Sequence, residues 1–266
     1  MAEVYIKHCR VLENRRLMEE TLLMRLQAPE IALAAQPGQF VMVRTGPRPE
    51  KGGPLLRRPF SLHRIYASGE IALLYRVIGL GTGLKEDMKP GDELEIMGPL
   101  GHGFDLTMAA PQSYLVAGGM GMAPMIALAE ALESRENTFF YGARTSREVE
   151  VFWTLIKETS YKGRVSVTSE DGIGFAGGLI TDPLAAALRA KPVPIFACGP
   201  RPMLAQVAGL AGEAGVPAQV SLEARMACGL GACLSCVVEM DAGKKSGEYS
   251  RVCSEGPVFL AGEVKW

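Results

Sequence analysis

Four cysteines near the C-terminal end constrain this chain more than any other feature. Cys228, Cys233 and Cys236 lie in one short run, and Cys253 follows seventeen positions later. A C-x4-C-x2-C run with a distant fourth cysteine is the spacing that holds a plant-type [2Fe–2S] cluster through four thiolates. We therefore expect a loop near the C-terminus that binds a two-iron cluster.

The residues between the first two cysteines fit such a loop. Gly229 and Gly231 can adopt positive φ and bring backbone N–H groups close to electron-rich sulfurs. Other interpretations stay open. A four-thiolate zinc site usually combines two C-x2-C knuckles, and only one is present. Disulfide frameworks are typical of short secreted chains, and plain buried thiols would not place three cysteines within nine positions.

Composition limits the classes of partner. The chain has 266 residues, 48% of them hydrophobic, which is enough for two compact domains and a small appendage. Its formal net charge of −1 gives no basic footprint for nucleic acid. The N-terminus lacks the pattern of a signal peptide, and the uncharged stretch 113–129 is interrupted by glycines and a proline. We expect a cytoplasmic protein that binds neither membrane nor nucleic acid.

Residues 1–106 carry the pattern of short β-strands. Apolar or alternating runs are separated by Gly- and Pro-rich turns such as 36–39 and 89–92. The runs are 4–6, 22–26, 40–43, 60–62, 71–78 and 93–96. Strands at such regular intervals predict an antiparallel β-barrel.

The pattern changes near residue 107, where apolar runs begin to alternate with helical segments. The runs are 114–117, 138–141, 165–167 and 194–197, and the helical candidates are 125–132, 149–159, 181–190 and 202–213. This alternation predicts a parallel α/β domain over 107–217. A final strand, 218–223, leads into the cysteine loop, so we expect 218–266 to form a small cluster subdomain.

Two glycine-containing turns lie in the expected α/β domain. The run Gly118-Gly119-Met120-Gly121-Met122-Ala123-Pro124 follows a strand and opens a helix, an arrangement that favours a pyrophosphate. Cys198-Gly199-Pro200 ends another strand at the sheet edge where α/β folds place ligands. Each could also be an ordinary tight turn.

Polar and aromatic residues mark two strands of the expected barrel. In Arg57-Arg58-Pro59-Phe60-Ser61 a guanidinium can contact a phosphate, and the serine can hydrogen-bond a ring system. The arginines could equally be a solvated surface pair. Tyr75-Arg76 is followed by Gly81-Thr82; Tyr75 could stack on an aromatic cofactor or belong to the core. The three histidines have no ligand-like spacing, so we expect no histidine-based catalytic or metal site.

Taken in order, these motifs resemble the ferredoxin–NADP reductase superfamily. Arg58 to Ser61 is similar to its flavin motif R-x-x-S, Gly118 to Pro124 to its nicotinamide loop, and Cys198 to Pro200 to its C-G-P turn. The run from Ser221 to Cys233 resembles the electron-transfer subunit of class 1B, NAD-dependent dihydroorotate dehydrogenase. The resemblance covers essentially the whole chain.

The resemblance implies one FAD, one [2Fe–2S] cluster and exchanging NAD(H). The residues that it assigns to FAD are Arg58, Pro59, Phe60, Ser61, Leu74, Tyr75, Arg76, Gly81 and Thr82. It also implies a partner, an FMN-containing catalytic subunit that oxidises dihydroorotate, in a heterotetramer of two subunits of each kind. The family uses NADH, although Arg144 and Arg147 could bind a 2′-phosphate.

The combination of groups suggests an electron path. Nicotinamide exchanges two electrons together and the cluster one, so FAD, which can do both, is expected between them. Hydride transfer requires no catalytic acid or base, and we predict no catalytic residue. Two alternatives remain. The chain could serve another NAD(P)H-linked complex, a sulfhydrogenase or a bifurcating NADH–ferredoxin–NADP enzyme, or it could be a non-catalytic scaffold holding zinc.

Overall fold

The structure, a computed structural model, describes residues 3–44, 54–241 and 248–266. These residues divide into two compact units, which are described separately. The barrel unit comprises 1–103, 223–237 and 251–257, and the α/β unit comprises 104–222, 238–250 and 258–266, apart from the residues outside the described ranges. Within those ranges, no helix is both long and apolar enough to cross a membrane.

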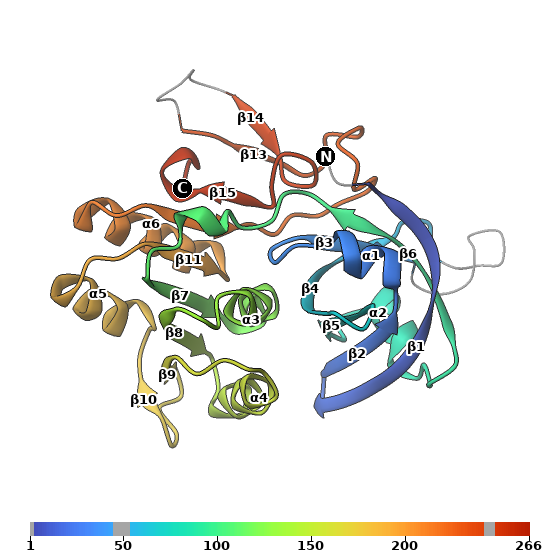
Figure 1. The fold of residues 1–266 in the computed structure, drawn as a ribbon, viewed down its shortest axis with the longest axis horizontal. Helices are drawn as coiled ribbons and strands as arrows, with labels where there is room; N and C mark the ends of the chain where they lie inside the picture. Colours follow the sequence, from blue (N-terminus) through green and yellow to red (C-terminus); the bar gives the residue numbers. More distant parts are fainter. Residues whose placement is uncertain (1–2, 45–53, 242–247) are drawn as a thin grey trace. The chain divides into compact units, whose positions relative to one another are not determined.

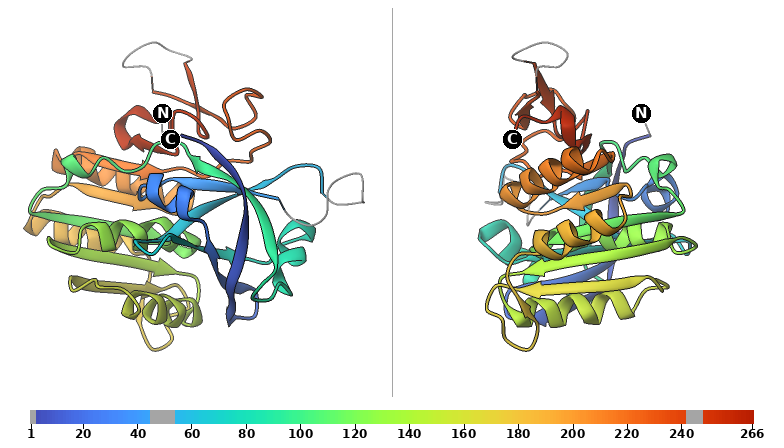
Figure 2. Two further views of the ribbon diagram at one scale, coloured as in Figure 1. Left: turned by 45° about the vertical axis from the view of Figure 1, so that its right-hand side comes forward. Right: turned by 90° about the vertical axis from the view of Figure 1, so that its left-hand side faces the viewer.

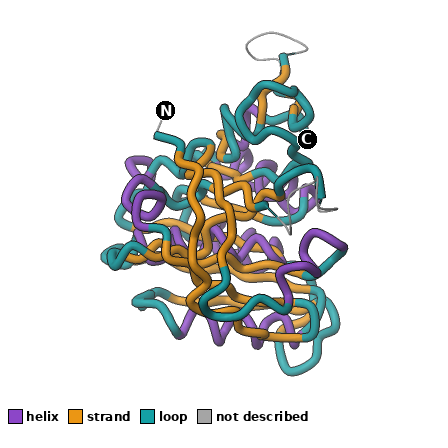
Figure 3. Tube along the Cα trace, turned by 90° about the vertical axis from the view of Figure 1, so that its right-hand side faces the viewer, coloured by secondary structure: helices purple, strands orange, loops and turns teal. Residues whose placement is uncertain are grey.

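The barrel unit contains the expected antiparallel barrel. Its strands close in the order β1-β2-β5-β4-β3-β6, and all neighbouring pairs are antiparallel. Figure 1 labels these strands, and Figure 3 shows the strands of the chain in orange. The strands are β1 (Tyr5–Met18), β2 (Thr21–Gln27), β3 (Phe40–Val43), β4 (Arg58–Tyr66), β5 (Glu70–Arg76) and β6 (Glu93–Leu100). The prediction of a six-stranded barrel is confirmed.

Alternation along the strands builds the barrel core. In β5, Ile71, Leu73 and Tyr75 belong to the buried core cluster, because every second side chain of a strand points to the same face. Two short helices, α1 (Pro29–Ala34) and α2 (Leu80–Glu86), were not expected from the sequence. Glycine is unfavourable inside helices, and α2 contains two glycines, so helix propensity does not predict this helix.

The α/β unit contains a seven-stranded sheet in the order β10-β9-β8-β7-β11-β12-β15. The strands are β7 (Gln112–Gly118), β8 (Glu136–Ala143), β9 (Arg164–Ser169), β10 (Ala176–Gly177), β11 (Ile195–Cys198), β12 (Ala218–Ser221) and β15 (Val258–Leu260). All pairs are parallel except β12 with β15. The predicted parallel sheet is confirmed, with β15 as an unexpected antiparallel edge.

Helices cover both faces of this sheet. In Figure 1, α3 and α4 lie on one face and α5 and α6 on the other; α5 and α6 face the viewer in the right panel of Figure 2. The helices are α3 (Met122–Ala131), α4 (Ser146–Lys157), α5 (Thr181–Ala190) and α6 (Arg201–Ala214). The remaining elements are β13 (Val237–Glu239) and β14 (Tyr249–Arg251), which pair with each other, and the 3-10 turns η2 (Leu106–Met108), η3 (Gly119–Gly121) and η4 (Ala261–Glu263).

The C-terminal tail is divided between the two units, unlike the single segment 218–266 that the sequence suggested. The cysteine-bearing segments 223–237 and 251–257 group with the barrel, whereas β12 and β15 belong to the sheet. The edge of β12 presents backbone N–H and C=O groups that need partners, and β15 supplies them.

Candidate functional site

The barrel unit brings the two cysteine segments together. Cys228, Cys233 and Cys236 lie in the loop before β13, and Cys253 lies in the turn after β14. The Val252 N–H donates to the Cys236 carbonyl oxygen at 3.0 Å and ties the two segments. Cys236 and Cys253 are buried and Cys233 is exposed. The structure therefore places the distant fourth cysteine beside the first run, as the spacing predicted.

Backbone N–H groups in this loop point at cysteine sulfurs. The Gly231 N–H donates to Cys253 Sγ at 3.1 Å, and the Leu230 N–H donates to Cys228 Sγ at 3.4 Å. Gly229 and Gly231 have φ of 72° and 81°, as expected. Donors aimed at thiolate sulfurs are what an iron–sulfur loop supplies. The donor set therefore fits a [2Fe–2S] cluster.

The loop also packs tightly on the barrel. A Cβ added at Gly229 would lie 2.7 Å from Cγ of Met42 in β3, and one at Gly231 would lie 2.7 Å from Oγ of Ser254. Side chains at these two positions would push the loop off the barrel or away from the second cysteine segment. The glycines therefore set both the backbone conformation and the close approach.

The cysteine thiols have different electrostatic surroundings. Hydrogen bonding by Ser235, whose hydroxyl lies 3.2 Å from Cys233 Sγ, lowers the pKa of Cys233 to about 6. Burial raises the pKa of Cys253 to about 12. In the described ranges, no group of three or more His, Cys, Asp or Glu side chains is arranged to hold a metal ion. The ligand set Cys228, Cys233, Cys236 and Cys253 thus remains a prediction from spacing and contacts.

The two arginines of the predicted flavin motif make different contacts. Arg57 pairs with Glu95 of β6, which Arg44 also contacts at 2.9 Å. Burial opposes ionisation of Glu95, but the bonds from Arg57 and Arg44 prevail and lower its pKa. The Arg58 guanidinium bonds instead to backbone, with Nη1 2.9 Å from the Leu56 carbonyl oxygen. Arg57 is thus a structural partner of Glu95, and Arg58 is the arginine suited to an external phosphate.

The other predicted flavin residues are split between two faces of the barrel wall. Phe60 and Tyr75 belong to the barrel core, and their rings meet edge-to-face with centroids 6.1 Å apart. Their chain neighbours Ser61 and Leu74 point to the opposite face by strand alternation. Of the two interpretations of Tyr75, the structure favours the core, and burial raises its pKa to about 12. Its predicted contact with FAD remains untested.

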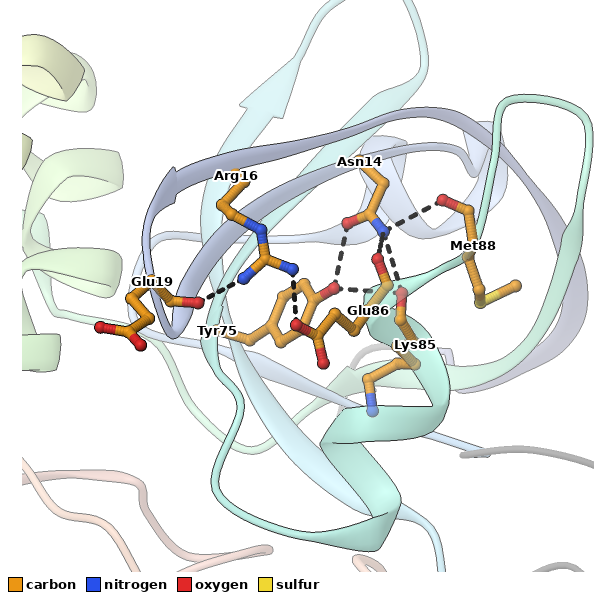
Figure 4. A network of polar contacts seen from close by, with 7 residues as sticks. All are labelled: Asn14, Arg16, Glu19, Tyr75, Lys85, Glu86 and Met88. Atoms are coloured by element: carbon orange, nitrogen blue, oxygen red, sulfur yellow. Dashed lines mark hydrogen bonds and ion pairs between the residues drawn. The ribbon is translucent and has the colours of Figure 1, made fainter.

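A polar network fixes the helix that carries Gly81 and Thr82 (Figure 4). The Asn14 amide donates from β1 to the carbonyl oxygens of Lys85 and Met88, at 2.9 and 3.1 Å. The Tyr75 hydroxyl lies 3.0 Å from Asn14 Oδ1 and 3.2 Å from the Lys85 carbonyl oxygen. These contacts anchor the C-terminal end of α2 to β1 and β5.

Lys85 is a residue at this site that the sequence motifs did not reveal. Its side chain is buried and its Nζ donates to the Gly81 carbonyl oxygen at 2.7 Å. No pattern in the chain marks it, because its burial depends on how α2 packs against β4 and β5. The nearest sequence signal is its spacing of four from Gly81, one helical turn.

In the α/β unit, the two glycine turns meet at the ends of neighbouring parallel strands. Ala117 of β7 pairs with Cys198 of β11. A Cβ at Gly121 would overlap the Cys198 carbonyl group, and a Cβ at Gly199 would lie 2.9 Å from the Gly118 backbone nitrogen. Close packing thus requires glycine in both turns.

The remaining predicted nucleotide residues lie at the same edge of the sheet. Gly119 has φ of 52°, and Pro124 is buried in the first turn of α3, which follows β7. Pro200 precedes the first residue of α6. Carboxyl ends of adjacent parallel strands are where α/β folds bind nucleotides. The arrangement therefore supports the predicted site without showing a ligand contact.

Arg144 and Arg147 lie at the carboxyl end of β8, the neighbour of β7. Both are exposed. The Thr145 hydroxyl caps α4 by accepting from the Glu148 N–H at 3.4 Å, which positions the first turn of the helix. The two guanidinium groups are thus accessible at the edge of the sheet that carries the glycine turns.

Comparisons with known proteins agree with this architecture. Residues 223–265 match the family described as the iron-sulfur cluster binding domain of dihydroorotate dehydrogenase B. The chain is 39% identical over 263 residues to the dihydroorotate dehydrogenase B (NAD(+)) electron transfer subunit of Desulforamulus reducens, covering 97% of each chain. It is 36% identical over 257 residues to the same subunit of Geobacillus thermodenitrificans, covering 96% of each.

Solved structures are similar too. An NADH-dependent reduced ferredoxin–NADP oxidoreductase, described in work on flavin-based electron bifurcation, aligns with a TM-score of 0.80 and 28% identity over 97% of this chain and 90% of that chain. A ferredoxin NADP+ reductase from Neisseria gonorrhoeae shares the fold, with a TM-score of 0.65 and 16% identity over 79% and 92% of the chains. The chain is 39% and 36% identical to two electron transfer subunits over almost their full length, which shows that it belongs to the family of dihydroorotate dehydrogenase B (NAD(+)) electron transfer subunits.

Proposed function

We propose that this chain passes electrons from the FMN of a dihydroorotate-oxidising partner through a [2Fe–2S] cluster and FAD to NAD⁺. The observation that carries the proposal is the cysteine loop, where two distant segments join and direct backbone donors at thiolate sulfurs. The same unit contains the residues predicted to hold FAD. When bound, a flavin would combine two single electrons from the cluster with one proton to form the hydride that nicotinamide accepts.

The proposal assigns residues to three sites. The cluster ligands are Cys228, Cys233, Cys236 and Cys253. The FAD residues are Arg58, Pro59, Phe60, Ser61, Leu74, Tyr75, Arg76, Gly81 and Thr82. The nicotinamide nucleotide residues are Gly118, Gly119, Gly121, Pro124, Cys198, Gly199 and Pro200.

The contacts of the protein give these residues separate tasks. Arg58 offers a guanidinium to a phosphate, since its described bonds engage only backbone carbonyls. Ser61, on the face opposite Phe60, offers a hydroxyl to a ring atom. Phe60 and Tyr75 support the wall from inside the barrel. We assign no side chain as acid or base, because the hydride transfer itself requires none and the proton taken up by the reduced flavin can come from solvent.

The partner would be an FMN-containing catalytic subunit, and the assembly two copies of each subunit in the cytoplasm. The relatives are named electron transfer subunits, which implies a second protein that performs the substrate chemistry. Of the two compact units, one contains the cysteine loop with the predicted FAD residues and the other contains the predicted nicotinamide residues, and the described residues form no third unit for that chemistry.

The test is to purify the chain with its catalytic partner and measure cofactor content and coupled activity. We expect FAD, an EPR signal of a reduced [2Fe–2S] cluster, and NAD⁺ reduction that requires both dihydroorotate and the partner. A colourless preparation that contains zinc and no iron would contradict the proposal and favour the structural scaffold.

A second candidate is the reductase subunit of a bifurcating enzyme. The similarity to an NADH-dependent reduced ferredoxin–NADP oxidoreductase at a TM-score of 0.80 favours it. The substrates distinguish the two functions. Coupled reduction of ferredoxin and NAD(P) without dihydroorotate would support the second candidate, whereas orotate formed in step with NADH supports the first.

A further inference from the structure

Lys85 carries a buried amine that has no carboxylate partner among the described residues. Its relative exposure is 2%, and it takes part in none of the ion pairs found there. Its Nζ lies 2.7 Å from the Gly81 carbonyl oxygen, and 4.7 and 5.8 Å from the ring centroids of Phe60 and Tyr75. Cation–π contacts offset part of the cost of burying an ammonium, but such burial normally requires an anion.

The charged groups around Lys85 do not supply that anion. From β4, Arg58 adds a positive charge that acts on Lys85. From β1, Arg16 faces the C-terminal end of α2, where it pairs with Glu86 at 2.5 Å. Asp87 and Glu86 act on the Tyr75 hydroxyl of β5. The pKa of Lys85 is lowered to about 7, mainly because the amine is buried and to a smaller extent because Arg58 is positively charged.

We propose that the Lys85 amine takes up a proton when FAD binds, so that the affinity for FAD rises as the pH falls. This rests on the proposed function. Lys85 bonds to Gly81, and the positive charge of Arg58 acts on it; both Gly81 and Arg58 are assigned to FAD. The pyrophosphate of FAD is a dianion, and an anion brought near a buried amine favours the charged form of that amine.

The direction in which FAD affinity changes with pH follows from the linkage between proton binding and flavin binding. In the free chain the amine is largely neutral above pH 7, and in the complex it is charged. Binding therefore takes one proton from solvent, and no redox step is involved. While the free form is neutral and the bound form charged, each rise of one pH unit weakens FAD binding by up to about tenfold.

The test is an FAD titration of the flavin-depleted full chain between pH 6.5 and 8.5, followed by flavin fluorescence. Three proteins are compared: wild type, Lys85→Met and Lys89→Met. Methionine has about the volume of lysine but no charge. Lys89 is an exposed lysine four positions further along, which makes it the matched control. We expect severalfold weaker binding per pH unit above 7 for wild type and Lys89→Met, and a change below about twofold for Lys85→Met.

Calorimetry of the wild type measures the proton directly. FAD is titrated at pH 8 in two buffers with different heats of ionisation, and the difference gives the number of protons bound. Uptake approaching one proton supports the inference, and no uptake overturns it, even if Lys85→Met fails to fold. Equal pH dependence in Lys85→Met and wild type also overturns it. A wild-type chain that binds no FAD at any pH would overturn the proposed function itself.

Discussion

Arg57 and Arg58 are neighbours in the sequence but have different partners. Arg57 shares Glu95 with Arg44, whereas Arg58 bonds only to backbone carbonyls within the described chain. We expect Arg58→Ala to weaken FAD binding about ten- to a hundredfold, because a charge-assisted hydrogen bond contributes about 1.5–3 kcal/mol. The measurement is FAD retained per chain after gel filtration, with a titration of the depleted protein.

Arg57→Ala is the matched control for that experiment. It removes one of two guanidinium groups from Glu95 and leaves the other in place. We expect a modest loss of thermal stability and nearly unchanged FAD affinity. Equal flavin loss in both variants would show that the two arginines affect FAD binding only by stabilising the barrel wall.

Lys85 gives the fold a specific pH dependence. Its pKa in the folded chain is about 7, below the ordinary lysine value of 10.5, so folding favours the neutral amine. Below pH 7 the folded chain must bury the charged amine, so the destabilisation of the folded state has its full value there. It declines as the pH rises and is absent above pH 10.5. Lys85→Met should therefore raise the free energy of unfolding of the flavin-depleted chain at pH 7 by on the order of 3 kcal/mol.

Urea unfolding at pH 7 and pH 9 measures this difference. Because the penalty declines over this range, the gap between Lys85→Met and wild type should shrink by about 2 kcal/mol. A gap of constant size at both pH values would mean that the substitution acts through packing rather than charge.

Among the elements, those with strong periodicity were predictable from the sequence. The six barrel strands and the helices α3 to α6 coincide with apolar runs and helical spacing, and the structure confirms them. The short elements α1, α2, β10, β13, β14 and β15 were missed. Two-residue and three-residue strands carry almost no periodicity, and β15 forms because the edge of β12 is open to it.

The candidate site likewise contains residues that the sequence predicted and residues that it did not. The cysteine spacing and the glycine turns were visible in the chain because ligand spacing and backbone freedom leave local signatures. Lys85 and the distinct partners of Arg57 and Arg58 were not visible. Glu95 is 51 residues from Arg44 and 38 from Arg57, and Asn14 is 71 residues from Lys85, so only the folded chain specifies these contacts.

The contact between the two glycine turns of the α/β unit leads to a prediction about one helix start. A methyl group at Gly121 would collide with the Cys198 carbonyl group, which is backbone and cannot turn away. We expect Gly121→Ala to separate α3 from the end of β11, to cost about 1–3 kcal/mol of stability, and to weaken NADH binding at least tenfold. Thermal unfolding and an NADH titration measure the two effects.

Gly212→Ala is the control, since Gly212 lies inside α6 with nothing within 4 Å of an added Cβ. Alanine is the better helix former, so this change should stabilise the chain by about 0.5–1 kcal/mol and leave NADH binding intact. If both substitutions had the same effect on NADH, the collision at Gly121 would not be the cause.

For the whole molecule, the division of the chain into units suggests that its two electron-transfer activities can be separated. The cysteine loop and the predicted FAD residues belong to the barrel unit, and the nicotinamide residues belong to the α/β unit. Cys233 is the exposed member of the four cysteines and lies outside the barrel core. Its replacement should therefore impair the cluster without unfolding the flavin site.

We expect Cys233→Ser, assembled with the catalytic partner, to lose orotate-coupled NADH formation at least a hundredfold while NADH-driven reduction of a dye through FAD stays within about twofold. Coupled transfer needs the cluster, whereas dye reduction needs only nicotinamide and flavin. Ser235→Ala, which removes the hydroxyl 3.2 Å from the same sulfur, is the milder comparison and should keep the cluster. Parallel loss of both activities in Cys233→Ser would mean that the loop supports the flavin structurally and does not relay electrons.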